Sequence, residues 1–301
     1  MDSPRVAVQG DPGCVSHAAA LAHFGTLDLV SCRDFEELFA AVLQGRADRG
    51  CVPVENALHG AVSESLDLFV QHPLSAVGEA YVRVEMCLAV RPGTIASELT
   101  AVASHPVALR QCRRFFRRHP HVREVVAADT AGSIRALMAT APPVEADPAC
   151  GRDGDDAGEP EQRAAGGWDG AIGPALAADL YGAELLMRGI EDHPRNFTRF
   201  LIVAREDDAV PHRGRDAKAS LAFTLPHRVG SLHGALGILA DAALDLTRLE
   251  SRPIPGRPWE YRFYADIRSA AGGAWAGALA ALGELATDVR VIGVYPEADA
   301  P

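Results

Sequence analysis

The sequence has few positive charges, no long apolar run and no closely spaced cysteine pair. Its 29 Lys and Arg residues stand against 40 Asp and Glu residues, which leaves a net charge of -11. Such an acidic protein repels the phosphates of nucleic acids and anionic lipid surfaces, so we expect no nucleic acid and no membrane as a partner. No stretch approaches the roughly 18 to 20 apolar residues of a membrane span, and the first residues contain no basic segment. We therefore expect a cytoplasmic protein.

The cysteines give no sign of a disulfide framework or of a zinc site. All six are scattered, with no CxxC pair and no histidine at a matching spacing: Cys14, Cys32, Cys51, Cys87, Cys112 and Cys150. We expect reduced, mostly structural thiols. A nucleotide-binding P-loop is also absent, because no Lys-Ser or Lys-Thr pair follows the turn Gly10 to Gly13.

The length allows one large or two ordinary domains, and the composition is typical of a globular protein with an ample core. The chain has 301 residues, of which 48% are hydrophobic. Runs with strand character alternate with helical patterns from the start of the chain, which favours a parallel sheet of the βαβ type. The predicted strands are residues 5–9, 27–30 and 49–54, and the predicted helices are residues 16–24 and 35–43.

The turns after two of these strands are candidate ligand sites, because ligands bind at the carboxyl ends of parallel strands. Gly10 to Gly13 leads into a helix, so its backbone N–H groups can receive an anion, with Ser16 as a further donor. Asn56 follows the third strand and offers both a donor and an acceptor. A plain helix start and a plain turn would show the same residues, and that alternative stays open.

A second alternating series follows in the middle of the chain. Its predicted strands are residues 101–103, 125–127 and 170–173, and its predicted helices are an arginine-rich one after Ser104-His105-Pro106, one through Ser133 to Met138, and residues 175–181. Ser104 and Thr130 each stand at a helix start, where they are either cleft residues or N-caps. Residues 141–167 are rich in Pro, Gly, Asp and Glu, so we interpret them as a mobile insertion.

The most suggestive polar motif is Asn196-Phe197-Thr198-Arg199-Phe200-Leu201, which enters an apolar strand. Thr198 supplies a hydroxyl, and Arg199 supplies a planar fork suited to a carboxylate. Phe197 and Phe200 can form dry walls around them. The pattern is typical of a site for a small organic acid, although an ordinary strand-edge pair facing water would have the same residues.

The C-terminal part follows a charged stretch without periodicity, residues 206–218, which we interpret as a linker. Beyond it, the predicted strands are residues 219–225, 244–250, 261–267 and 289–295, and the predicted helices are residues 230–243 and 274–286. This is the order βαββαβ, which is typical of a ferredoxin-like α+β fold.

Taken in order, these motifs resemble those of the prephenate dehydratase family. Asn196 to Phe200 is similar to the family's Asn-Phe-Thr-Arg-Phe, Pro53 to Asn56 to its Pro-Ile-Glu-Asn, and Gly10 to Ser16 to its Gly-Pro-x-Gly-Thr-Phe-Ser. The resemblance implies an α/β catalytic domain over residues 1–205 with the bilobal architecture of periplasmic binding proteins. Its lobes would be residues 1–79 with 180–205, and residues 80–179.

This resemblance also implies a reaction. Prephenate would lose its ring hydroxyl and a carboxylate together, giving phenylpyruvate, carbon dioxide and water, without a cofactor and without a metal. Thr198 and Arg199 would be the catalytic residues, with Thr198 bonded to the leaving hydroxyl and Arg199 and helix N-termini holding carboxylates. The implied substrate-binding residues are Gly13, Ser16, Asn56, Ser104, Thr130, Asn196, Phe197 and Phe200.

The C-terminal pattern, residues 219–297, resembles an ACT regulatory domain. The resemblance implies that L-phenylalanine binds as an effector and that the chain forms a homodimer or homotetramer. The implied effector-binding residues are Gly230, Ser231, Leu232, Glu250, Ser251, Arg252 and Pro253. A domain that only dimerises would have the same pattern.

The sequence departs from the family pattern at a few positions, which keeps two other functions open. The departures are Cys14, Val15, Ala57, Glu85 and Met86, where relatives carry other residues, among them histidines at the last two places. One alternative is an arogenate dehydratase, which runs the same chemistry on the aminated substrate. The other is a catalytically weakened homologue that only binds an aromatic metabolite.

Overall fold

The computed structural model describes residues 3–139, 167–212, 214, 217–269 and 275–299. The chain forms two compact units: the first is Met1–Gln9, Ala19–Val82 and Phe197–Pro301, and the second is Gly10–Ala18 and Arg83–Asn196. Each unit contains its own β-sheet. The insertion expected over residues 141–167 lies outside the described residues except for Gly167, and Cys150 lies outside them too.

The first unit begins with the expected parallel βαβ arrangement. Strand β1 (Arg5–Gln9) lies between β2 (Asp28–Cys32) and β3 (Arg49–Asn56) and is parallel to both. Helix α1 (Val15–Phe24) and helix α2 (Phe35–Leu43) make the connections. Helix α2 starts where it does because the side chain of Asp34 accepts a hydrogen bond from the N–H of Glu37 at 2.8 Å.

Four further elements complete this part of the first unit. Helix α3 (Ser63–Gln71), β4 (Gly60–Ala61), β5 (Leu74–Arg83) and β11 (Phe197–Arg205) join it, and β11 runs antiparallel to β3. A β-bulge falls between Arg199 and Phe200. A short 3-10 turn, Glu206–Asp208, follows β11.

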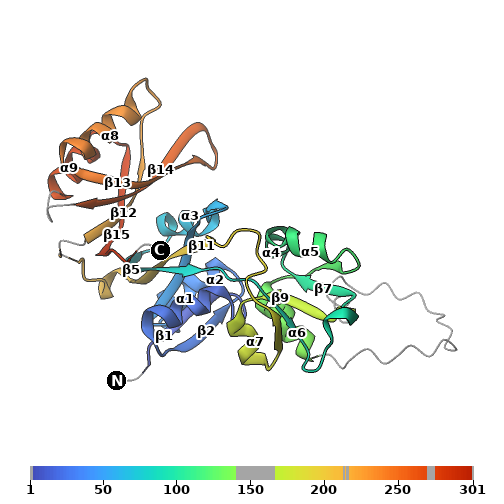
Figure 1. Cartoon of the computed structure of the whole chain (residues 1–301). Coiled ribbons are helices and arrows are strands. Elements are labelled where there is room, and N and C mark those ends of the chain that lie inside the picture. The colour runs from blue at the N-terminus through green and yellow to red at the C-terminus, as the bar shows by residue number, and fades with distance from the viewer. Residues whose placement is uncertain (1–2, 140–166, 213, 215–216, 270–274, 300–301) are drawn as a thin grey trace. The chain divides into compact units, whose positions relative to one another are not determined.

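The C-terminal segment, Ala217–Pro296, has the predicted βαββαβ order (Figure 1). Its elements are β12 (Ala217–Thr224), α8 (Ser231–Asp241), β13 (Leu244–Ile254), β14 (Arg257–Ser269), α9 (Trp275–Leu285) and β15 (Asp288–Pro296). The strands lie in the order β13-β14-β12-β15. Helices α8 and α9 cover one face of them, where Leu221, Leu239 and Ile267 form a core.

The other face of the C-terminal strands packs on the N-terminal strands of the same unit. Tyr264 and Tyr295 belong to one buried cluster with Leu66, Leu201 and Val203. All of β12 is therefore buried, and the ten strands form one continuous sheet. The segment groups with the first unit. The expected linker is correspondingly shorter, because Ala217 and Lys218 already belong to β12.

The two halves of this sheet meet where β15 runs beside β5, at Gly293 and Ala76. A Cβ atom on Gly293 would collide with the carbonyl oxygen of Ala76 and lie 2.7 Å from its nitrogen. We expect Gly293→Ala to lower the unfolding temperature, because rigid backbone has to move. Gly283→Ala in helix α9 is the control: its Cβ meets nothing within 4 Å, and alanine favours a helix. Thermal unfolding of both variants checks this, and equal midpoints would contradict it.

The second unit holds a five-stranded sheet in the order β10-β6-β9-β7-β8. Its strands are β6 (Cys87–Val90), β7 (Ala101–Ser104), β8 (Arg123–Val126), β9 (Gly170–Gly173) and β10 (Glu184–Met187). Its helices are α4 (Pro106–Gln111), α5 (Arg113–Arg118), α6 (Thr130–Ala139) and α7 (Ala175–Tyr181), with a 3-10 turn at Ala96–Glu98. The expected single arginine-rich helix is thus broken in two at Cys112. None of the helices in the described part of the chain is long and apolar enough to span a membrane.

The division between the units differs from the predicted lobes. Residues 180–196 group with the second unit, because β10 pairs with β6 and the N–H of Ile190 donates to the carbonyl of Met86. Residues 10–18 also group there, and the hydroxyl of Tyr181 donates to the carbonyl of Pro12 at 2.9 Å. The local strand and helix patterns of the sequence do not show that these two segments group with the second unit.

Candidate functional site

The centre of the candidate site in the first unit is a pair of side chains on neighbouring strands, Thr198 on β11 and Asn56 at the end of β3. The antiparallel register places the two residues opposite each other. The amide nitrogen Nδ2 of Asn56 donates to the hydroxyl Oγ1 of Thr198 at 3.0 Å and to the carbonyl of Phe197 at 3.2 Å. Thr198 is 8% exposed, and Asn56 is half-buried.

The orientation of the Asn56 amide is fixed by its other end. Its oxygen Oδ1 accepts from the backbone N–H of Leu58 at 3.0 Å and of His59 at 3.1 Å. Backbone N–H groups only donate, so the oxygen faces them and the NH₂ group faces Thr198. The Thr198 oxygen therefore accepts one hydrogen bond from Asn56, and its own proton stays available to donate. A hydroxyl held in this way is suited to stabilise an oxygen that gains negative charge.

Arg199, the next residue, is placed differently from its neighbour. Successive side chains of a strand point to opposite faces, and the bulge comes only after Arg199. Its guanidinium is 5% exposed and is held by the carboxylates of Glu79, at 2.7 Å, and Asp266, and by the phenol of Tyr295, at 2.9 Å. The fork expected to face a substrate carboxylate is thus engaged by protein groups.

Glu79 on β5 anchors this buried ion-pair network. Its side chain is 0% exposed and contacts Arg199 and the ammonium of Lys218, at 3.2 Å. Lys218 is the one lysine among the 301 residues, and it lies at the start of β12. Asp266 in turn accepts a hydrogen bond from Ser220, whose hydroxyl also meets that of Tyr295. Charged groups of the N-terminal strands and of the C-terminal segment therefore neutralise each other in the interior.

The protonation of the network follows from its geometry. Burial alone would lower the pKa of Arg199, but the carboxylates of Asp266 and Glu79 raise it above its ordinary value. Burial alone would raise the pKa of Asp266, but Arg199 and Arg248 hold it below its ordinary value. Burial and the charge of Asp266 raise the pKa of Tyr295 well above its ordinary value. At neutral pH the network thus holds charged arginine, charged aspartate and neutral phenol.

The aromatic residues and the asparagine of the motif take separate positions. Phe200 is 1% exposed and belongs to the buried core. Phe197 is half-buried, and its carbonyl accepts from the N–H of Ala57 at 2.8 Å. Asn196 belongs to the second unit, where its amide donates to Gln111 at 3.1 Å.

The turn expected to receive an anion lies in the second unit, and its donors have local partners. The N–H of Gly13 donates to Nδ1 of His17 at 3.0 Å, and the N–H of Cys14 donates to the carbonyl of Asp11 at 3.1 Å. Burial lowers the pKa of His17, which keeps its ring neutral and able to accept. Ser16 is 7% exposed and lies one residue inside α1, not before it. In this conformation the turn is a capped helix start.

Ser104 and Thr130 also lie in the second unit. Ser104 is fully buried at the end of β7, and its hydroxyl donates to the carbonyl of Ile172 at 2.6 Å. The expected N-cap role belongs instead to His105, whose Nδ1 accepts from the N–H of Val107. Thr130 is half-buried and opens α6, where Asp129 caps by accepting from Gly132 at 2.6 Å.

The departures Glu85 and Met86 have structural partners in the second unit. Met86 is 5% exposed and part of the core. Its N–H donates to Glu191 at 2.9 Å, and Glu191 also pairs with Arg83 at 2.7 Å. Glu85 lies 3.5 Å from the guanidinium of Arg83. Glu191, in the segment before the main motif, was not among the predicted residues. Among the described residues, no three His, Cys, Asp or Glu side chains converge as metal ligands would.

The thiols give a pH-dependent prediction. The five described cysteines form no disulfide with one another and are buried, and burial raises the pKa of Cys14 and Cys32 to about 11 and that of Cys112 to about 12. Thiols of the unfolded chain have a pKa of about 8.5. We therefore expect stability to fall as the pH rises from there toward 11, because only the unfolded chain then loses protons. Iodoacetamide at pH 8, followed by mass spectrometry, should leave Cys14 unmodified until denaturant is added. Equal alkylation with and without denaturant would contradict this.

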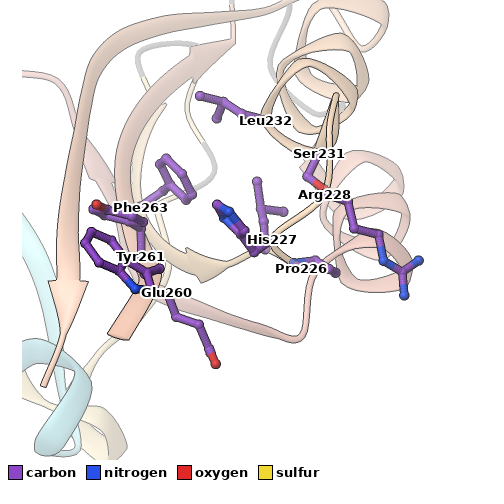
Figure 2. Close-up of a pocket in the computed structure, with 10 residues that line it drawn as sticks. Pro226, His227, Arg228, Ser231, Leu232, Glu260, Tyr261 and Phe263 are labelled. Carbon is purple, nitrogen blue, oxygen red and sulfur yellow. The ribbon is translucent and has the colours of Figure 1, made fainter. Parts of the chain in front are cut away.

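The C-terminal segment contains a pocket of about 140 Å³ between the start of α8 and strand β14 (Figure 2). It is lined by Leu225, Pro226, His227, Arg228, Ser231, Leu232, Trp259, Glu260, Tyr261 and Phe263. Figure 2 shows His227 lying toward Tyr261 and Phe263, whereas the guanidinium of Arg228 points away from them. Two predicted effector residues, Ser231 and Leu232, line this pocket. Gly230 caps α8 with a positive φ of 86°, a conformation that favours glycine.

Sequence reasoning missed the aromatic wall of this pocket. Trp259 is 77% exposed and has a φ of 68°, which is rare for a bulky residue and often marks a functional position. The alternation of Trp259, Tyr261 and Phe263 was the available signal, because alternate residues of a strand share a face.

The second predicted effector group, Glu250 to Pro253 on β13, does not line the pocket. Arg252 instead forms an ion pair with Asp67 on α3 at 2.7 Å, and the hydroxyl of Tyr264 donates to Asp67 at 3.0 Å. A bulge lies between Leu246 and Arg248, and beyond it the side chain of Arg252 faces the N-terminal part of the unit.

Comparison with known protein families gives a family match for most of the chain. The family model for prephenate dehydratase matches residues 6–208. The chain is 34% identical to the bifunctional chorismate mutase/prephenate dehydratase of Escherichia coli K12, over 98% of this chain and 71% of that protein. It is also 34% identical to the chloroplastic arogenate dehydratase/prephenate dehydratase 2 of Arabidopsis thaliana, over 97% of this chain and 72% of that protein.

Solved structures cover the C-terminal segment as well. GqqA, described as a novel type of quorum quenching acylase, aligns with a TM-score of 0.80 and 31% identity over 98% of both chains. The prephenate dehydratase of Arthrobacter aurescens, solved in complex with L-Phe, aligns with a TM-score of 0.79 and 27% identity over 97% of this chain and 90% of that chain.

Proposed function

This chain belongs to the prephenate dehydratase family, and we propose that it converts prephenate to phenylpyruvate, with loss of carbon dioxide and water, in L-phenylalanine biosynthesis. The enzyme would be a carbon-oxygen lyase. The observation that carries the proposal within the molecule is the pair of Asn56 and Thr198, which leaves the Thr198 proton free to donate. We further propose that the two units form the two lobes of a periplasmic-binding-protein-like catalytic domain, with the C-terminal segment as an ACT domain.

The chemistry requires little beyond positioning. The C–C bond to the ring carboxylate breaks, its electron pair enters the ring, and the ring C–O bond breaks to release hydroxide. Hydroxide is a poor leaving group, so a hydrogen bond to that oxygen stabilises the transition state more than the ground state. Thr198 supplies this bond, and solvent supplies the proton that completes water. Aromatisation drives the reaction.

The other predicted substrate-binding residues differ in how exposed they are and in which unit they lie. Gly13, Ser16 and Thr130 stay proposed contacts of the substrate carboxylates from helix starts of the second unit. Phe197, which is half-buried, stays a proposed wall. Ser104, Asn196 and Phe200 stay proposed substrate-binding residues, and their side chains are buried in this structure.

We propose that L-phenylalanine binds in the pocket of the C-terminal segment. The pocket offers a benzene ring apolar and aromatic contacts from Leu232, Tyr261 and Phe263, and His227 as a polar partner. The relative from Arthrobacter aurescens was solved in complex with L-Phe, which supports the same ligand here. The chain would work as a cytoplasmic homodimer or homotetramer.

Arogenate is the second candidate substrate, because curated relatives at the same level of identity carry arogenate dehydratase in their names. It differs from prephenate in having an amino group on the side chain, away from the leaving hydroxyl, so Thr198 would act in the same way on both. Acylase activity, named for the similar structure GqqA, is not a third candidate function for this chain. An acylase nucleophile needs a base to take its proton, whereas the Thr198 oxygen faces a donor.

The test is formation of product by the purified chain from prephenate and from arogenate, each with and without phenylalanine. We expect phenylpyruvate from prephenate and a lower rate when phenylalanine is present. Faster turnover of arogenate than of prephenate would make arogenate the proposed substrate, with the mechanism unchanged. No product from either substrate, with aromatic ligands still binding, would overturn the proposal in favour of a binding-only homologue.

A further inference from the structure

Two pairs of residues lie side by side where β11 meets β3, and they face opposite ways. Thr198 is opposite Asn56, and Arg199 is opposite Glu55. The first pair forms the candidate site. The second points to the C-terminal segment, where Arg199 reaches Asp266 and Tyr295, and Glu55 lies 3.6 Å from Arg248. One short piece of strand thus carries the site on one face and the attachment of the C-terminal segment on the other.

We propose that Arg199 is a positioning residue through which the C-terminal segment sets the place of Thr198. The proposal rests on the function proposed above and concerns the control of the same site. Arg199 is bonded covalently to Thr198, and its guanidinium is clamped by Glu79 on one side and by Asp266 and Tyr295 on the other. A planar guanidinium held by several hydrogen bonds passes a shift of its partners to the backbone of β11 more directly than a flexible side chain would.

Strand β14 links this clamp to the pocket of the C-terminal segment. Tyr261 and Phe263 line the pocket, and Asp266 lies three residues further along the same strand. A ligand that moves β14 therefore moves the carboxylate that holds Arg199. The side chains of the network also have space to move when β14 moves. Nη2 of Arg248 is buried without a partner among the described residues, and a cavity of about 10 Å³ lies beside Arg199, Arg248 and Asp266. This is about the space of one water molecule.

A second tie between the same parts provides a matched control. Asp67 on α3 pairs with Arg252 and accepts from Tyr264, so it also fastens the C-terminal segment to the N-terminal strands. Among the hydrogen bonds and ion pairs of the described residues, none joins Asp67 to β11. Asp67→Asn therefore weakens the attachment without touching Arg199.

The experiment compares Tyr295→Phe and Asp266→Asn with Asp67→Asn. Tyr295→Phe removes one hydroxyl and keeps the buried ring, so it preserves folding even if Asp266→Asn does not. We expect both network variants to lower kcat by about 10- to 100-fold with KM within about twofold, because a small displacement of a catalytic group acts on the transition state. Phenylalanine should still bind to them but change kcat less. Asp67→Asn should keep the kcat of the unaltered chain.

An unchanged kcat in Tyr295→Phe, or an equal loss in Asp67→Asn, would overturn the proposal. A rise in KM alone would return Arg199 to direct substrate binding. Amide hydrogen exchange gives a readout that does not need turnover. Exchange over residues 197–201 should be faster in the network variants and unchanged in Asp67→Asn. If the unaltered chain turns over neither substrate but exchange behaves in this way, the proposed function fails and the positioning role stands.

Discussion

Replacing Thr198 by valine is expected to lower kcat by about 10²- to 10³-fold, the usual cost of removing one well-placed donor. Valine has the shape of threonine, and Thr198 is only 8% exposed, so we expect the variant to keep the fold. The Asn56 amide keeps a partner, because it also donates to the carbonyl of Phe197. Thr198→Ser should keep most of the activity. Steady-state kinetics with prephenate check both variants.

Asn56→Asp is the sharper version of this experiment. A carboxylate still accepts the backbone hydrogen bonds of Leu58 and His59, but it accepts the Thr198 proton instead of donating to the hydroxyl. We expect turnover to fall nearly as far as in Thr198→Val, with the thermal midpoint little changed. Full activity of a folded Asn56→Asp variant would show that the direction of the Asn56–Thr198 hydrogen bond does not matter.

Glu79→Gln is expected to have the largest effect on stability. The substitution keeps the size of the side chain but leaves Arg199 and Lys218 as buried cations with too little negative charge nearby. Removing one partner of a buried pair typically costs about 3 to 5 kcal/mol. Denaturant unfolding measures this as a shift of the midpoint at constant slope.

The control for Glu79→Gln is Asp48→Asn, which breaks the ion pair between Asp48 and Arg5. The side chains of that pair are 42% and 47% exposed, so solvent screens it and we expect a much smaller change. Similar losses in the two variants would mean that burial of the Glu79 network adds nothing to stability.

Most of the secondary structure could be predicted because its signals are local. The helix at residues 35–43 and the strand at 170–173 have the predicted bounds, and the βαββαβ order holds. The assignment of residues 10–18 and 180–196 to the second unit could not be predicted, because it depends on pairing such as that of β10 with β6. Hydrophobic periodicity shows that a strand has a buried face but not which element covers it.

The candidate site was predicted by residue type but not by role. The sequence predicts both Thr198 and Asn56 as site residues, but their mutual hydrogen bond depends on the register of two strands distant in sequence. The sequence predicts that Arg199 binds a substrate carboxylate, whereas in the structure its guanidinium binds the carboxylates of Glu79 and Asp266. No local pattern distinguishes a guanidinium that binds a substrate from one that binds a distant aspartate. In the same way, Arg252 was grouped with the effector residues but pairs with Asp67.

The position of Lys218 allows proteolysis to report on the attachment of the C-terminal segment. It is the one lysine in the 301 residues, its side chain is 4% exposed, and it begins a strand that is buried throughout. A protease specific for lysine therefore has a single peptide bond to cut, at the start of the C-terminal segment. The bond is inaccessible while β12 is in the sheet, so the appearance of fragments 1–218 and 219–301 measures how often that strand detaches. The chain thus carries its own reporter for release of the C-terminal segment, without any added label.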